Sequence, residues 1–352
     1  MIRDEHIEAA VAQGILTGDQ AVRLRDLARK DLAPASVNDG LPDPDDEKFR
    51  LIGGFNDVFV TIGVLLLVAA FFGLASVLDF RPGLAVLAMI SAWGLSEFFS
   101  RRMRLALPSI TLALMFAGAT GFLATSFAAL LPSGADWADD RGFRLWIPLF
   151  SLGVLAGGVA HHWRFRVPID VAIAAGGLTY AVYNGIGVIA PDWILDNGSA
   201  LAAVLGLLLF ASAVRTDASD TRRLTRRSDV AFWLHLLAAP MIVHAVIPLV
   251  AGPVSALGTG QAFAVLVVFA LLGIVALVID RRALLVSGLT YAGIAIGYLL
   301  SQSVAEGMGL SLTLLGLAIV VLGLSAGWRY LRRTVLPLLP LGSLRHAVPP
   351  AS

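Results

Sequence analysis

The segment Arg164–Ala190, RFRVPIDVAIAAGGLTYAVYNGIGVIA, joins a basic turn to a long stretch of apolar and small residues. Arg164 and Arg166 stand at its start, and Tyr180 and Asn184 lie within the apolar part. A transmembrane helix needs about 20 mostly apolar residues, and in lipid the backbone polar groups must be satisfied within the helix. The same pattern recurs along the chain and predicts a polytopic, all-α membrane protein.

The composition supports lipid as the solvent for most side chains. The chain has 352 residues, of which 57% are hydrophobic and 14% are charged. A soluble domain has about 45–50% apolar and about 25% charged residues. No cysteine is present, which excludes disulfides, thiolate metal sites and cysteine nucleophiles. The net charge of +1, with basic residues confined to short loops, indicates no nucleic-acid partner; the expected partner is the lipid bilayer.

Apolar stretches of transmembrane length follow one another from residue 57 onward. Runs such as VTIGVLLLVAAFFGLASVL do not alternate between polar and apolar residues, which excludes the strands of a β-barrel. Asn56 or Asp57 is expected to cap the first helix. We predict about ten transmembrane helices, arranged as up-down hairpins, over residues 57–78, 83–100, 105–131, 145–162, 167–190, 198–214, 230–251, 261–279, 283–301 and 310–328.

The arginines provide an independent test of this number of spans. They gather in alternate connections and in the C-terminal tail, whereas the remaining connections hold only Arg81, Arg141 and Arg144. Because Lys and Arg collect on the cytoplasmic side, every loop fits ten spans with both termini in the cytoplasm. The first 50 residues are polar and do not resemble a secretory signal peptide.

The N-terminal region predicts a small cytoplasmic helical hairpin. Gly14 is suited to end its first helix, and Thr17 with Gln20 forms a capping box that opens the second. Two such short helices have little core of their own, so we expect them to dock on a protein partner, a membrane loop or another copy. The predicted organisation is a head at 1–30, an acidic Pro-rich linker at 31–56, a transmembrane domain at 57–328 and a cytoplasmic tail at 329–352.

The seventh span contains the most unusual polar residues. His235 and His244 are predicted at membrane depth, with Pro240 between them. Ionisable residues within a span are functional candidates because lipid makes them costly. Nine residues correspond to about two and a half helical turns, so an unkinked helix places the two imidazoles on opposite faces and not in one metal site. Proton handling or ligand contact is one interpretation; neutral histidines bonded to neighbouring helices are the other.

Aromatic hydroxyls and an amide complete the candidate intramembrane polar site. Tyr180 and Asn184 share one helix face, as do Tyr291 and Tyr298 on the ninth span. They could line a polar cavity, or they could form hydrogen bonds between spans that pack through small residues. The glycines expected at such packing contacts are Gly176, Gly177, Gly288 and Gly293. The candidate site comprises His235, His244, Tyr180, Asn184, Tyr291 and Tyr298.

Charged residues near the predicted inner ends of the spans have simpler interpretations. Glu97 and Asp170 each lie close to arginines, which favours interfacial ion pairs over a coupling-ion site. His161 and His162 are neighbours on a helix and point about 100° apart, which disfavours a metal site. We find no phosphate-binding loop, no HExxH motif and no GxSxG motif. No set of residues therefore points to an enzyme, although intramembrane catalysis stays open, and we predict no catalytic, cofactor or metal residue.

One five-residue motif occurs twice. GLTYA stands at 177–181 and 288–292, in the predicted fifth and ninth spans, which run in the same direction. A duplicated helical hairpin would produce this repeat, but these residue types are also common in membrane helices. Both interpretations remain open.

The order of HIEAAVAQGILTGDQAVRLRDLA, an acidic linker and FRLIGGFNDVFVTIG resembles a family of bacterial membrane proteins of unknown function. In that family a short helical head precedes about eight to twelve spans. The resemblance implies a location in the bacterial inner membrane. It supplies no activity and no site residues.

Three classes of function fit these observations. A secondary transporter or permease for a small solute agrees with ten spans, a Pro-containing seventh helix and polar residues near mid-membrane. Ten spans with both termini inside also resemble the drug/metabolite transporters, although the inverted repeat of that fold is not evident. The second class is a non-transporting scaffold or sensor whose head recruits a partner. Intramembrane catalysis is the third.

Overall fold

The computed structural model describes residues 7, 13–22, 54–78, 81–126, 140–220, 223, 225–252, 258–302, 308–340, 342 and 348. The chain divides into two compact units, Met1–Asp46 and Glu47–Ser352. The second unit holds all of the long helices, and its described part contains no strand. The predicted all-α architecture is confirmed.

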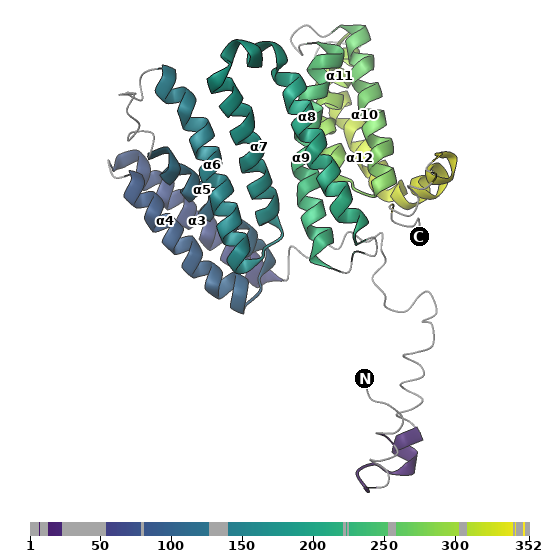
Figure 1. Cartoon of the computed structure of the whole chain (residues 1–352). Coiled ribbons are helices and arrows are strands. Elements are labelled where there is room, and N and C mark those ends of the chain that lie inside the picture. The colour runs from purple at the N-terminus through teal and green to yellow at the C-terminus, as the bar shows by residue number, and fades with distance from the viewer. Residues whose placement is uncertain are drawn as a thin grey trace. The chain divides into compact units, whose positions relative to one another are not determined.

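Ten helices in the described chain are long and apolar enough to cross a bilayer, as predicted from the sequence. They run up and down in chain order, so that consecutive helices form hairpins (Figure 1). The helices are α3 (Phe55–Val77), α4 (Arg81–Ser96) with the π-helical turn η1 (Glu97–Arg102), α5 (Ala106–Ser126), α6 (Asp140–Phe165), α7 (Ile169–Ile189), α8 (Pro191–Ala218), α9 (Arg226–Ala251), α10 (Thr259–Ile279), α11 (Ala283–Ser301) and α12 (Gly309–Val335), followed by the short 3₁₀ turn η4 (Leu336–Leu338).

Two helices extend well beyond their predicted apolar stretches. With a rise of 1.5 Å per residue, α8 and α12 are each about 40 Å long, which exceeds the roughly 30 Å hydrocarbon core of a bilayer. Helix α8 begins at Pro191, because proline is favoured at the first helical position. Helix α12 continues through Arg332 and Arg333, because basic residues suit the negative end of a helix.

The start of α3 differs from the expectation that Asn56 or Asp57 caps it. The capping position is Gly54, no side chain makes a capping hydrogen bond, and the helix begins at Phe55. Asp57 instead lies in the first turn, buried, where a carboxylate suits the positive end of the helix. The expected cap was therefore wrong, because Gly54, with a φ of 146°, occupies the capping position and has no side chain to accept a hydrogen bond.

The N-terminal unit contains the predicted capping box. Thr17 N donates to Gln20 Oε1 at 2.9 Å, and Gln20 N donates to Thr17 Oγ1 at 3.3 Å. Gly14 has a φ of 71°, the left-handed conformation of a helix C-cap. Ile7 and Ala21 are buried. The predicted capping box is thus confirmed, whereas most of the first predicted helix and nearly all of the linker at 31–56 lie outside the described residues.

The arginine-rich turns, η1–α5, α6–α7, α8–α9 and α10–α11, share a backbone feature. Each has one residue with a positive φ: 56° at Arg104, 54° at Arg166, 52° at Arg223 and 57° at Asp280. These residues are roughly 60 positions apart. Because a positive φ is uncommon for residues other than glycine, the four turns reverse the chain in a similar way. We call the side of the bundle where these turns lie the arginine-rich side.

The two GLTYA copies occupy equivalent places in their hairpins. Gly177 faces the preceding helix α6, and Gly288 faces Phe269 of the preceding helix α10. Gly176 faces Leu237, and Gly293 faces Leu317. The predicted role of these glycines in packing between spans is confirmed, and internal duplication stays a prediction.

Helices α5, α6 and α7 approach one another closely enough for backbones to touch. A Cβ built on Gly153 would lie 2.7 Å from Gly121 Cα of α5, and a Cβ on Gly177 would lie 2.5 Å from Leu155 N of α6. Small residues allow such approach in membranes, where dispersion contacts and not a hydrophobic driving force hold helices together. Helix α6 is therefore tied on both sides by glycine contacts.

We predict that Gly177→Ala lowers the midpoint of thermal unfolding in detergent, because the added methyl group overlaps the α6 backbone. Overpacking of this kind costs about 1–3 kcal/mol. Gly185 lies in the same helix, and a Cβ there meets nothing within 4 Å. Gly185→Ala is therefore the matched control, and better helix propensity should leave its midpoint unchanged or raised. Equal behaviour of the two variants would contradict the close packing.

Candidate functional site

The six residues of the predicted intramembrane site do not converge. His235 on α9 is fully buried. Its ring centroid is 5.3 Å from that of Phe210 on α8, and its Nε2 is 3.7 Å from Asp217 Oδ2. Neither ring nitrogen has a hydrogen-bond partner among the described residues. His235 therefore faces α8, close to a buried carboxylate.

His244 faces a different helix, as the spacing on α9 predicts. Its Nδ1 donates to the carbonyl of Pro240 at 2.9 Å, and its ring centroid lies 5.2 Å from that of Tyr291 on α11. Tyr291 and Tyr298 pack beside an apolar cluster that includes Val243. Because His244 bonds its own helix, its polar atoms do not line a shared cavity with His235.

Tyr180 and Asn184 lie on a third surface. The Tyr180 side chain is 54% exposed, and Asn184 Nδ2 donates to the Tyr180 carbonyl at 2.8 Å. On a membrane helix an exposed tyrosine faces lipid or another protein. The structure thus separates the six candidate residues into three places: His235, His244 with the two tyrosines of α11, and the α7 pair.

A hydrogen-bonded chain that the sequence analysis missed joins three helices at the arginine-rich side. Ser96 Oγ is 3.1 Å from His161 Nε2, and His161 Nδ1 is 2.9 Å from Asp170 Oδ1. All three residues are 0% exposed. They come from the ends of α4 and α6 and from the first turn of α7. We call them the α6–α7 centre.

Glycine permits this arrangement. A Cβ on Gly158, one turn before His161 on α6, would lie 3.1 Å from the Asp170 carbonyl oxygen. Because Gly158 has no Cβ, the first turn of α7 packs against α6, and the Asp170 carboxylate reaches the His161 imidazole across the short turn at Arg166. The signal in the sequence was a histidine nine residues before an aspartate across a basic turn; nothing indicated Ser96.

Donor and acceptor capacity determines where the hydrogen atoms of the α6–α7 centre lie when Asp170 is ionised and His161 is neutral. An ionised carboxylate only accepts hydrogen bonds, so the Nδ1–H of neutral His161 donates to Asp170, and Nε2 accepts from the Ser96 hydroxyl. This is the order of groups in a serine-hydrolase triad. A nucleophile must reach substrate, however, and Ser96 lines neither of the two cavities that we describe. The smaller, about 590 Å³, lies over Glu97 and Phe98 on a different face of the helix.

Some polar atoms of the α6–α7 region have no hydrogen-bond partner among the described residues. They are Asp170 Oδ2 and Ser100 Oγ, and both atoms are buried. His162 Nδ1 lies 3.9 Å from Asp170 Oδ2. Most buried polar atoms in proteins are satisfied, so this carboxylate oxygen is the atom of the centre that is available for a further hydrogen bond.

Aromatic rings surround the imidazole, and an exposed ion-pair cluster lies nearby. The His161 ring centroid is 4.6 Å from that of Phe165 and 5.8 Å from that of Phe116. Glu97 pairs with Arg164 at 2.7 Å and with Arg101 at 3.2 Å. The predicted interfacial ion pair of Glu97 is confirmed. The predicted arginine partner of Asp170 is wrong, because His161 occupies that place inside the bundle.

A second buried polar cluster, the α8–α12 centre, joins the remaining helices at the arginine-rich side. Arg281 donates two hydrogen bonds to Asp217, from Nη2 at 2.6 Å and from Nε at 3.0 Å. Its Nη2 also lies 3.2 Å from both the carbonyl and the hydroxyl oxygen of Ser228. A bidentate pair of this kind fixes both distance and orientation, so it holds α8, α9 and the α10–α11 turn together.

Asp280 is the other carboxylate of this centre. It accepts a hydrogen bond from Trp328 Nε1 at 2.8 Å and forms ion pairs with Arg223 at 2.9 Å and Arg332 at 3.4 Å. Arg332, fully buried, also donates to the Leu277 carbonyl at 3.0 Å. These contacts attach α12 and the α8–α9 turn to the end of α10.

The two centres differ in how their charge is balanced. Each carboxylate of the α8–α12 centre is paired with arginine, which stays protonated at all physiological pH values. The carboxylate of the α6–α7 centre is paired with a histidine and has no arginine partner among the described residues. His235 Nε2 lies 3.7 Å from Asp217 Oδ2, so both centres contain a histidine beside a carboxylate, but in the described chain only the α8–α12 centre also contains arginines.

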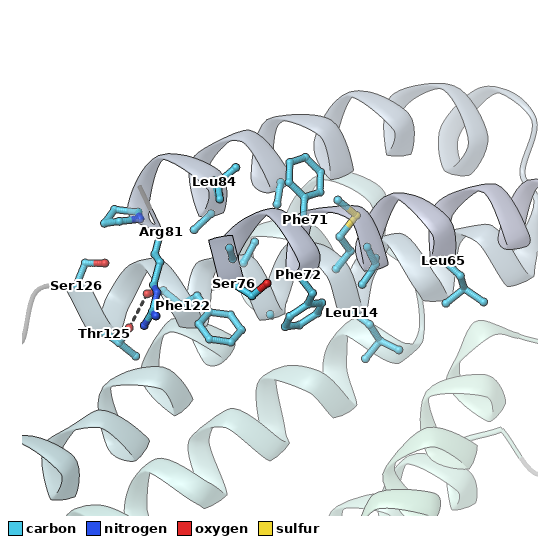
Figure 2. Close-up of a pocket in the computed structure, with 18 of the residues that line it drawn as sticks. Leu65, Phe71, Phe72, Ser76, Arg81, Leu84, Leu114, Phe122, Thr125 and Ser126 are labelled. Carbon is cyan, nitrogen blue, oxygen red and sulfur yellow. Dashed lines mark hydrogen bonds between the residues drawn. The ribbon is translucent and has the colours of Figure 1, made fainter. Parts of the chain in front are cut away.

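A larger cavity lies in the other half of the α3–α5 bundle, away from the arginine-rich side (Figure 2). Its volume is about 810 Å³, and its wall is mainly apolar. Phe71 and Phe72 of α3 and Phe122 of α5 contribute rings to it, while Arg81 and Thr125 lie together at one end. The cavity is thus amphipathic, with its polar groups at one end.

We predict that Arg281→Gln destabilises the protein strongly, because Asp217 would keep a buried negative charge without its partner. Removing one member of a buried ion pair costs roughly 3–5 kcal/mol. Arg215 is exposed on the same helix as Asp217, and Arg215→Gln should change stability by less than about 0.5 kcal/mol. Thermal unfolding in detergent measures both effects. An Arg281→Gln variant as stable as Arg215→Gln would show that the Arg281–Asp217 ion pair does not stabilise the fold.

Comparison with family models, with curated proteins and with solved structures finds no match. Among the described residues, no group of three or more His, Asp or Glu side chains could hold a metal ion. The resemblance to a bacterial membrane family stays a hypothesis. The chain is an integral membrane protein with ten apolar helices, and its function must be inferred from the two centres and the cavity.

Proposed function

We propose that the protein is a secondary transporter or permease for a small solute, and that the α6–α7 centre couples transport to protons. The observation that supports this most is the fully buried His161–Asp170 pair, 2.9 Å apart, with one carboxylate oxygen left without a partner. Chains of histidine and acidic residues inside membrane domains mark proton relays.

The cost of buried charge explains why such a pair would hold and release a proton. With neutral imidazole and ionised carboxylate, the pair carries one net negative charge, which is expensive in a low-dielectric interior. Binding one proton makes the pair neutral overall, whichever partner receives it. Water that reaches the pair in another conformation would remove this penalty and allow release.

Helix α4 connects this centre with the cavity. Ser96 ends the α-helical part of α4, and Ala88, eight residues earlier, lines the cavity. At 1.5 Å per residue the two positions are about 12 Å apart along one rigid helix. A tilt of α4 would therefore change the cavity and the hydrogen bond to His161 together. The π-helical turn η1 directly after Ser96 is the type of local irregularity that often accompanies functional sites.

The proposal includes an orientation. The arginine-rich side faces the cytoplasm, because basic residues collect there in membrane proteins. The α6–α7 centre then lies near the cytoplasmic surface of the bacterial inner membrane, and the cavity lies toward the opposite leaflet.

A scaffold or sensor whose head binds a partner is the alternative from the sequence. It rests on residues 1–30, of which the structure describes Ile7 and residues 13–22. The alternative predicts that deletion of residues 1–30 removes the cellular phenotype while replacement of Asp170 does not. A proton-coupled transporter predicts the reverse.

We predict that energised membrane vesicles containing the protein lose part of their proton gradient when a transported solute is added. The assay records the fluorescence of a pH-gradient dye while a panel of organic acids, amines and amphiphiles is added one compound at a time. Asp170→Asn should reduce the response at least about tenfold, because Asn still accepts the hydrogen bond from His161 but leaves the pair neutral, so that binding a proton would create a buried charge instead of removing one.

Glu97→Gln is the matched control for this experiment. It removes the same charge from a partly exposed ion pair at the same end of the bundle, and its response should equal that of the wild type. Thermal unfolding of both variants checks that the fold is retained. A wild-type response that survives in Asp170→Asn, or a panel without any response, would contradict the proposal.

A further inference from the structure

We infer that the cavity between α3, α4 and α5 is a binding site for a single-chain anionic amphiphile, with the acyl chain among the phenylalanines and the acidic head at Arg81. This inference goes beyond the proposed function, because binding at this site requires neither transport nor protons. It follows from the shape of the cavity, its lining and the charge at its end.

The size and shape of the cavity suit one elongated apolar molecule. A volume of about 810 Å³ falls within the range of roughly 300–1,000 Å³ that holds one small ligand. Along α3 the lining runs from Leu65 to Ser76, which is about three helical turns or 16 Å. An acyl chain is apolar and extended, so it matches this wall over its whole length.

The charge at the end of the cavity selects the head group. Arg81 makes no ion pair with any described residue, and its side chain extends toward Phe122 and Thr125 in Figure 2. Thr125 and Ser126 add hydroxyl groups at the same end. Arg81 also begins α4, whose N-terminal end is the positive end of the helix dipole. One guanidinium with two hydroxyls fits a head with one negative charge, such as a carboxylate.

The depth of the site agrees with such a molecule in a bilayer. Arg81 stands at the end of its span, where a long basic side chain can reach the membrane interface. An amphiphile in either leaflet keeps its charged head at that depth and its chain inside. The exposed apolar residues Leu65 and Phe72 border the cavity, so the molecule can enter sideways from lipid.

Binding can be measured with cis-parinaric acid, a fluorescent fatty acid that accepts energy from tryptophan. Trp146 lines the cavity and serves as the donor. The full-length protein in zwitterionic nanodiscs should show saturable energy transfer to the acid. Trp146→Phe should reduce the transfer, while unlabelled hexadecanoate still competes for the bound probe.

Two variants test separately the contact of the acyl chain with the cavity wall and the contact of the acidic head with Arg81. Gly118→Phe fills the cavity, where a Cβ meets nothing within 4 Å, and should abolish saturable binding. Arg81→Gln should weaken binding of the acid about tenfold and leave binding of its uncharged methyl ester unchanged. Arg227→Gln removes an exposed arginine from the arginine-rich side and should bind the acid like the wild type. Arg81 is exposed, so its replacement tests the inference even if Gly118→Phe does not fold.

Several outcomes would overturn the inference. They are equal binding of the acid by wild type and Arg81→Gln, equal affinity of the wild type for acid and methyl ester, and stronger competition by phosphatidylglycerol than by hexadecanoate. The last result would identify a two-chain phospholipid as the occupant. Because the assay contains no proton gradient, loss of solute-driven proton movement in Asp170→Asn is a separate result and does not affect this test.

Discussion

The cost of placing charge inside a bundle of apolar helices governs the arrangement of this protein. Three buried carboxylates, those of Asp170, Asp217 and Asp280, lie at the arginine-rich ends of the spans, and each has a cationic or imidazole partner from another helix or turn. A lone buried charge would destabilise the fold, so each partner fixes the position of its helix. The turns with positive φ bring these partners to one side of the bundle.

Two different solutions to helix association occur along the chain. Between α5, α6 and α7, glycines let backbones touch, so dispersion contacts hold the helices. Between α8 and α12, arginine–carboxylate pairs add to apolar packing, and Trp328 donates a hydrogen bond to Asp280. The α6–α7 centre is the exception in the first group, because it is polar, buried and incompletely satisfied. Packing alone does not require it, which is why we place function there.

The sequence predicted what depends on local pattern and failed where distant segments meet. Hydropathy gave ten spans, and the capping box at Thr17 and Gln20 formed as expected. The six candidate polar residues lie in three separate places, and His235 and His244 contact different helices, as their nine-residue spacing predicts. The sequence predicted an ion pair for Asp170 but not its contact with His161 and Ser96. That contact depends on how three helix ends pack together, and no local sequence pattern indicates this packing.

Cysteine accessibility tests most directly whether these buried centres lie at the cytoplasmic end of a membrane-spanning bundle. The chain contains no cysteine, so single substitutions need no altered background. Arg227 and Asp192 are exposed at opposite ends of the spans. An impermeant maleimide should label Asp192→Cys in intact cells and Arg227→Cys only after the membrane is permeabilised. Labelling of Arg227→Cys in intact cells would contradict the account.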